Sequence, residues 1–133
     1  MIFISNCTLN KVVKHHGVHN LEKKNNKILV SEMNTNDVVT LIGTPSTKST
    51  FDNDVWIYLE RKITSSKVKS LGKEKLLSNN VLVLEFNDRG ILVKKEFLNL
   101  QDMKKLELSK NKTSVINKKD TFVNTFISSM RQK

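Results

Sequence analysis

The sequence is poor in several residue types, and each scarcity excludes a class of structure. Among its 133 residues it has one cysteine (Cys7) and one proline (Pro45), and it has no alanine. A single cysteine cannot form an intrachain disulfide or supply the cysteine pairs of a structural zinc site. No apolar run approaches the roughly 18 residues that a transmembrane helix requires. The chain length fits one globular domain and excludes two full domains.

The chain is strongly basic, but it has few arginines. It holds 23 Lys and Arg against 13 Asp and Glu, a formal net charge of +10, and only three of the basic residues are Arg. Because Arg makes the bidentate contacts to phosphates and bases, its scarcity weakens a nucleic-acid interpretation. The excess is uneven, with 8 basic and 6 acidic residues in 1–66 against 15 and 7 in 67–133. A basic C-terminal tail of this kind is typical of a solvated segment.

The first seven residues form a short apolar run that ends at Cys7. The run is too short for a complete signal peptide. Ile4-Ser5-Asn6-Cys7 resembles a bacterial lipobox, in which an aliphatic residue and two small residues precede a cysteine that is lipidated, although Asn6 departs from the usual Gly or Ala. We therefore expect residues 1–7 to be the remnant of a lipoprotein signal peptide and Cys7 to carry the lipid. The alternative is a free thiol near the N-terminus.

Residues 8–20 are polar and basic without a clear period, which predicts a tether. His15, His16 and His19 fall at helical spacing, but no Asp, Glu or Cys accompanies them. A solvated linker is therefore favoured over a metal site.

Two short helices are predicted after the tether. Residues 21–30 can form the first. In the second, Asn34 is a good N-cap, and Asp37 three residues later can take the reciprocal role in a capping box. Gly43 and Pro45 are expected to end this helix.

Three strands are predicted in the second half of the domain. Residues 55–62 alternate, which indicates a strand with one buried face and one aromatic, partly exposed face. The buried face has Val55, Ile57 and Leu59, and the other face has Trp56, Tyr58 and Glu60. Residues 81–86 and 91–98 are joined by Asn87-Asp88-Arg89-Gly90, a connection typical of an antiparallel hairpin. Residues 63–80 are expected to form a long Lys-rich loop.

The C-terminal part ends in an amphipathic segment. Residues 121–130 place their apolar side chains on one helical face. These side chains are Phe122, Val123, Phe126, Ile127 and Met130. Docking on the core is the favoured interpretation, and binding to a membrane surface or a partner is the alternative.

The sequence favours binding over catalysis. It lacks a nucleophile elbow and a metal-binding His-Glu-x-x-His pattern, and its carboxylates Asp52 and Asp54 suit turn and capping roles. Aromatic residues are enriched where interfaces concentrate their binding energy, and Phe51 and Trp56 bracket this acidic loop. For Trp56, packing in the core is an equal alternative.

The central part of the chain resembles the BamE (SmpA/OmlA) family, small outer-membrane lipoproteins of the β-barrel assembly machinery. The resemblance lies in the spacing of matching residues and covers about residues 17–100. The matching residues are Met33, Val38, Ile42-Gly43-Thr44-Pro45, Phe51, Trp56-Ile57-Tyr58 and the hairpin Val83-Leu84-Glu85-Phe86-Asn87-Asp88-Arg89-Gly90-Ile91-Leu92. Glu32 stands where the family usually has Gly, and Asn34 replaces a capping Thr.

The resemblance implies an α+β fold of two short helices packed on a three-stranded antiparallel sheet, in the order ααβββ, with a C-terminal amphipathic helical extension. The BamE-like domain would span residues 21–108, and a basic extension would follow over residues 109–133.

The resemblance also implies a non-enzymatic accessory lipoprotein that stabilises the assembly complex. It would be lipid-anchored at Cys7 on the periplasmic face of the outer membrane. The expected partners are BamD, other assembly subunits and anionic lipid, with no cofactor, metal, nucleic acid or small-molecule substrate. The partner-binding candidates are Phe51, Asp52, Asn53, Trp56, His19 and Asn20. The alternatives are a cell-envelope inhibitor or wall-binding domain of similar fold, and a basic nucleic-acid-binding module.

Overall fold

The computed structural model describes residues 12–50, 54–65, 74–103, 123 and 125–129. The elements in chain order are β1 (Val12–Gly17), α1 (Leu21–Asn25), α2 (Thr35–Ile42), β2 (Thr47–Thr50), β3 (Asp54–Ser65), β4 (Glu74–Phe86) and β5 (Leu92–Leu98). Short helical segments follow at residues 100–103 and 125–129. None of the helices in these residues is long and apolar enough to cross a membrane.

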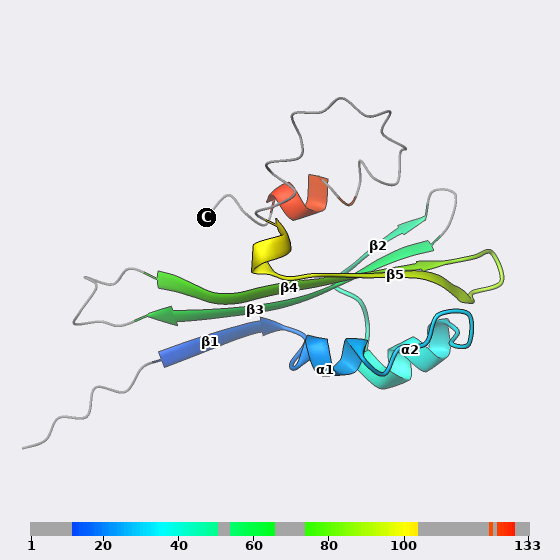
Figure 1. Cartoon of the computed structure of the whole chain (residues 1–133), viewed down its shortest axis with the longest axis horizontal. Coiled ribbons are helices and arrows are strands. Elements are labelled where there is room, and N and C mark those ends of the chain that lie inside the picture. Colours follow the sequence, from blue (N-terminus) through cyan, green and yellow to red (C-terminus); the bar gives the residue numbers. More distant parts are fainter. Residues whose placement is uncertain (1–11, 51–53, 66–73, 104–122, 124, 130–133) are drawn as a thin grey trace, which may run out of the picture.

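The strands form one antiparallel sheet with the order β1-β3-β4-β5 (Figure 1). β1 and β2 share the remaining edge of β3, because Gly17 lies opposite Glu60 and Thr47 lies opposite Ile57. The α+β class is therefore confirmed, but the prediction of three strands is wrong, since the sheet has five. The two additional strands are short and mostly polar, and neither has an alternating apolar pattern.

Strand β1 corrects the prediction of a tether over residues 8–20. Val12–Gly17 form a strand, although Val12 and Val13 are about half exposed. Backbone pairing to β3 holds β1 in place, with Val12 opposite Ser65. Because its side chains bury little apolar surface, hydrophobic periodicity could not reveal it.

The β3–β4 hairpin is longer than predicted. Residues 63–80 were expected to form a loop, but β3 continues to Ser65 and β4 already begins at Glu74 opposite it. A register shift follows Lys62. This shift and the polar side chains around it interrupt the period-2 pattern, which is why the strands are not evident in the sequence.

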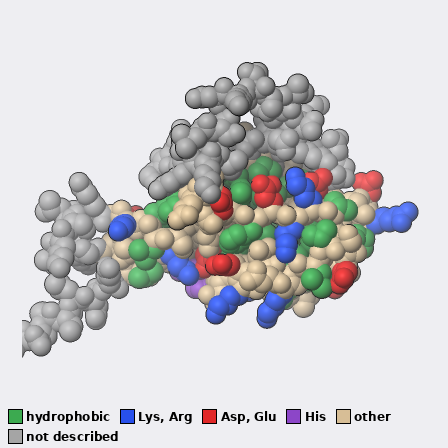
Figure 2. Space-filling view, viewed as in Figure 1, with side chains coloured by type: hydrophobic (Ala, Val, Ile, Leu, Met, Phe, Trp, Pro, Cys, Tyr) green, Lys and Arg blue, Asp and Glu red, His purple; other side chains and the backbone are tan. Residues whose placement is uncertain are grey.

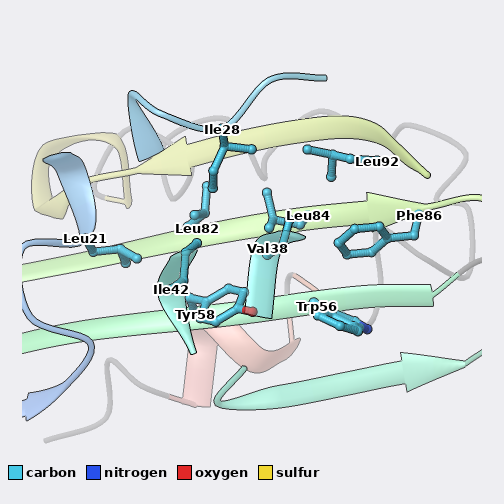
Figure 3. Packing of buried hydrophobic residues seen from close by; sticks show 10 residues of the cluster. All are labelled: Leu21, Ile28, Val38, Ile42, Trp56, Tyr58, Leu82, Leu84, Phe86 and Leu92. Carbon is cyan, nitrogen blue, oxygen red and sulfur yellow. The ribbon is translucent and has the colours of Figure 1, made fainter. Parts of the chain in front are cut away.

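Helices α1 and α2 cover one face of the sheet, here called the helix face (Figures 1 and 3). The core on this face contains Leu21, Ile28, Val38, Ile42, Trp56, Tyr58, Leu82, Leu84, Phe86 and Leu92. Trp56 and Tyr58 therefore lie in the core, and the prediction of a partly exposed face for them is wrong. Both faces of β3 are covered. Successive side chains along this strand therefore alternate between two buried clusters and not between a buried and an exposed face.

Local signals place the second helix and the hairpin turn as predicted. Asn34 Oδ1 accepts the N–H groups of Asn36 and Asp37 at 2.8 and 3.0 Å, and the Asp37 carboxylate accepts the Asn34 N–H at 2.9 Å, which completes the capping box. In the turn, Asn87 Oδ1 accepts the N–H of Ile91 at 2.9 Å. The first helix is shorter than predicted, with five residues.

The opposite face of the sheet, here called the second face, has its own apolar cluster. Its members are Val55, Ile57, Val81, Val83, Leu98, Met103 and Ile127, with Leu59, Val123 and Phe126 packed against them. Ile127 and its neighbours come from the C-terminal amphipathic segment. Docking of this segment on the core is confirmed for its described residues, 123 and 125–129.

Candidate functional site

A buried carboxylate lies where β1, α1 and β3 meet. Glu60 is 2% exposed, on the helix face of β3. Its Oε1 accepts the backbone N–H of Asn20 and its Oε2 that of Leu21, both at 3.1 Å. Because Asn20 is the N-cap of α1 and its own side chain makes no capping hydrogen bond, Glu60 performs this task from a distant strand.

The same carboxylate binds side chains from three strands. Its Oε1 lies 3.2 Å from His15 Nε2 on β1 and 3.2 Å from Lys62 Nζ on β3. Its Oε2 accepts the side-chain amide of Asn80 on β4 at 3.2 Å. Glu60 therefore ties β1 and α1 to the centre of the sheet.

These contacts determine the charge state of Glu60. Burial by itself raises the pKa of the carboxyl, but hydrogen bonds from His15, Lys62, Asn80 and the backbone of Leu21 outweigh burial and lower the pKa from 4.5 to about 2. Glu60 is thus a stable anion at neutral pH. Its alternating position predicted a partly exposed face. Of its partners only Lys62 is near Glu60 in the sequence, and no local pattern indicates His15, Asn20, Leu21 or Asn80.

Two of the predicted partner-binding residues lie beside this carboxylate. The rings of His19 and His15 are stacked, with centroids 3.7 Å apart and planes 8° apart. Asn20 follows with a left-handed backbone, φ 55° and ψ 46°. Both His19 and Asn20 are exposed, so they form an accessible surface over the buried Glu60.

Gly17 allows β1 to reach this junction. Its φ is +80°, and a Cβ at this position would overlap the carbonyl oxygen of Leu59. The next residue, Val18, donates its N–H to that same oxygen at 2.7 Å. In the sequence, the only sign of this close approach to another backbone is the glycine itself, between His16 and Val18.

The opposite end of β3 holds the other predicted region. Trp56 packs against Phe86, with ring centroids 4.7 Å apart, and the Lys48 ammonium lies 4.1 Å from the indole centroid. Trp56 is 5% exposed, so the structure favours its core interpretation over partner contact. Phe51, Asp52 and Asn53 lie outside the described residues, as does Cys7.

Tyr58 joins two of the motifs that carry the family resemblance. Its hydroxyl donates to the carbonyl oxygen of Gly43 at 2.9 Å, which links the end of α2 to β3. Burial raises the pKa of Tyr58 well above its ordinary value, so the hydroxyl stays protonated and remains a donor. The hydrogen bond between Tyr58 and Gly43 thus gives a structural reason for the spacing between the motifs Ile42-Gly43-Thr44-Pro45 and Trp56-Ile57-Tyr58.

The described surface has no strong charge of one sign. The described residues include 11 Lys and Arg against 10 Asp and Glu. Figure 2 shows these basic and acidic side chains interspersed over the visible face. Most of the net charge of +10 therefore belongs to residues outside the described ranges.

Comparison with known proteins assigns the family. The sequence matches the outer membrane protein assembly factor BamE domain over residues 20–96, more than half of the chain. No curated protein and no solved structure gives a match. The matched residues include α1, α2, β2 and β3, all of β4 and most of β5. The chain thus belongs to the BamE family of outer membrane protein assembly factors.

Proposed function

We propose that this protein is a non-enzymatic accessory lipoprotein that stabilises the machinery folding and inserting β-barrel proteins into the outer membrane. The match to the BamE domain over residues 20–96 carries this proposal, because the family is an outer membrane assembly factor. The described part of the domain also has a buried core beneath an exposed junction formed by His19 and Asn20, which suits a binding role.

Lipidation of Cys7 would attach the domain to the periplasmic face of the outer membrane. Each buried methylene of an acyl chain contributes about 0.8 kcal/mol to membrane binding, and stable anchoring takes more than one chain. Only residues 8–11 separate Cys7 from the start of β1 at Val12. At roughly 3.3–3.6 Å per residue, the domain would lie within about 18 Å of its anchor. The membrane and the β1 end of the sheet would therefore be close together.

BamD and other assembly subunits are the proposed protein partners. The two regions proposed for this contact are His19 and Asn20, which are exposed beside Glu60, and Phe51, Asp52 and Asn53, which precede β3 in the sequence and lie outside the described residues. Glu60 lies six residues after Asp54 on β3, which corresponds to about 20 Å at roughly 3.3 Å per residue. A partner contacting both regions would thus lie along β3 and the strands β1 and β2 at its edge.

Anionic lipid is a proposed second contact. Residues 67–73 and 104–133 supply most of the excess positive charge. Lys and Arg near an anionic membrane surface each contribute about 1 kcal/mol to binding. A short connection to the anchor would hold these residues near lipid headgroups.

The test of anchoring is Cys7→Ala, expressed from the gene with its full upstream region. We expect the wild-type protein in the outer-membrane fraction with a mass increased by its acyl chains. The variant should leave this fraction and lack the added mass. A Cys7→Ala protein that stays in the outer membrane with unchanged mass would contradict lipidation.

A further inference from the structure

Strand β5 lies at one edge of the sheet and pairs only with β4 among the described strands (Figure 1). At its start this edge already binds another part of the chain. Ser31 donates its N–H to the carbonyl oxygen of Leu92 at 2.8 Å, and Leu92 donates its own N–H to that of Met33 at 2.9 Å. Beyond Leu92, no described segment pairs with the outer side of residues 93–98. A strand edge of this kind can bind a further strand through its outward N–H and C=O groups.

The hydrogen-bond pattern of the sheet shows which backbone groups face this edge. The carbonyl oxygen of Leu59 accepts the N–H of Val18, so the odd-numbered residues of β3 direct their backbone groups away from β4. Because this direction alternates along a strand, the even-numbered residues at the centre of β3 and β4 bind each other, and the odd-numbered residues of β4 bind β5. On β5, the even-numbered residues of 94–98 therefore face β4, and Lys95 and Phe97 face the free edge.

We propose that β5 pairs with β5 of a second copy of this chain, in antiparallel orientation and centred on Lys95. A two-fold axis at Lys95 places outward backbone groups opposite outward backbone groups, as antiparallel pairing requires. Lys94 then lies opposite Glu96 of the second copy, and Val93 lies opposite Phe97 of the second copy. This contact needs neither a lipid anchor nor another subunit, so it stands apart from the function proposed above.

The charges along β5 favour a second copy as the occupant. Lys94 and Glu96 are both exposed, and they lie opposite Glu85 and Val83 of β4. Opposite charges directly across two strands stabilise their pairing, and like charges destabilise it. Because the contact is two-fold symmetric, the pair of Lys94 with Glu96 occurs twice. The strand is therefore complementary to itself in this register.

The two central lysines do not oppose this pairing. The Nζ atom of Lys95 donates to the carbonyl oxygens of Asn25 and Ile28 at 3.1 and 3.0 Å. Each ammonium group is thus held against its own domain, at the end of α1, and not against its counterpart across the axis. The pairing would also cover Val93, which is 43% exposed, with Phe97 of the second copy.

The opposite edge of the sheet lacks this complementarity. Strand β1 contains Lys14, His15 and His16 and no acidic residue, and the only charged residue of β2 is Lys48. Two copies of either strand would therefore bring basic residues together. Pairing of β5 with β1 of another copy would be heterologous and would not close with two molecules. The sequence of β5 thus favours a closed dimer.

The first test measures the mass of the full-length chain by sedimentation equilibrium over a range of concentrations. The paired stretch, residues 93–97, is shorter than the about 20–30 residues a side of a standard interface. We therefore expect a monomer at about 1 µM and a half-dimeric sample at about 100 µM. A wild-type chain that remains monomeric at about 1 mM would overturn the proposal.

Charge reversal tests the register. Lys94→Glu and Glu96→Lys each place like charges across the axis, so each variant should dimerise at least about tenfold more weakly than the wild type. An equimolar mixture of the two variants should form a heterodimer, because opposite charges again face each other. Glu22→Lys makes the same change at an exposed residue of α1 and should dimerise as the wild type does. Single variants that dimerise normally, or a mixture without heterodimers, would overturn the proposal.

Two further measurements separate folding from pairing. Trp56 is the one tryptophan and packs on the helix face, so its fluorescence reports whether that core is intact. If Lys94→Glu does not fold, Glu96→Gln and Glu96→Lys replace the mixture, and Lys should weaken the dimer more than Gln does. Amide exchange of Lys95 and Phe97 should be slower in the dimer than in the monomer. Slower exchange only in the presence of another protein would overturn the proposal, because that protein would then be the occupant.

Discussion

Glu60 is the residue on which the junction of β1, α1 and the sheet depends. A buried carboxylate is stable only when hydrogen bonds and opposite charges replace its water. Glu60 obtains them from the backbone at the start of α1 and from His15, Lys62 and Asn80. Apart from Lys62, two residues along the same strand, its partners are 20 to 45 residues away in the sequence. Local patterns could not identify this role, since all the other contacts are long-range.

Replacing Glu60 should destabilise the protein at neutral pH. Glu60→Gln keeps the shape but removes the charge that strengthens each hydrogen bond, and hydrogen bonds to charged groups are worth about 1.5–3 kcal/mol. We expect the free energy of unfolding to fall by about 2 kcal/mol, measured by denaturant titration. Glu74→Gln is the matched control, because Glu74 pairs with Lys14 at the exposed surface and should contribute far less. Equal losses in the two variants would contradict this account.

The same carboxylate predicts a loss of stability in acid. The pKa of Glu60 is about 2 in the folded protein, below its ordinary value of 4.5. A lowered pKa stabilises the fold fully above pH 4.5, and the contribution disappears as the pH falls from 4.5 towards 2. Thermal unfolding at a series of pH values should show this loss in the wild type and a smaller one in Glu60→Gln. Identical pH profiles would show that Glu60 is not the group responsible.

At the scale of elements, strand β1 distinguishes what sequence patterns reveal from what they miss. Helix α2 and the β4–β5 turn were predicted because their signals are local, in the Asn34 and Asp37 capping box and in Asn87 and Gly90. β1 is held by backbone pairing, by Glu60 and by the close approach of Gly17 to β3. None of these interactions requires regularly spaced apolar residues, so none leaves a periodic pattern in the sequence.

Gly17 should be required for the attachment of β1. Gly17→Val places a side chain on the carbonyl of Leu59 and in a left-handed conformation that favours glycine. We expect hydrogen exchange of residues 12–17 to become at least tenfold faster while α2 keeps its protection. His16→Val is the control, since His16 is exposed on the same strand and valine favours strands. Retained protection in Gly17→Val would mean that β1 does not need this close approach.

At the scale of the whole molecule, the sheet is covered on both faces, and this explains why Trp56 lies in the core rather than at a partner-binding surface. Trp56 was a contact candidate because it is an aromatic residue beside Asp52 and Asp54 on a predicted partly exposed face, with packing in the core as an equal alternative. The helices cover that side and the C-terminal segment covers the other, so Trp56 belongs to the core. The exposed candidates in the described part of the chain are then His19 and Asn20. The family and the order ααβββ within the larger sheet were accessible from sequence, because motif spacing reflects contacts such as that of Tyr58 with Gly43.

The most direct test of the central claim is purification of the tagged full-length protein from membranes of its own organism, in mild detergent. The account predicts that BamD and other assembly subunits co-purify with it at a constant ratio, and that this association persists when salt is raised enough to remove contacts made by the basic tail alone. Recovery of the protein from the outer membrane without any assembly subunit would contradict the account and favour a cell-envelope inhibitor or wall-binding domain.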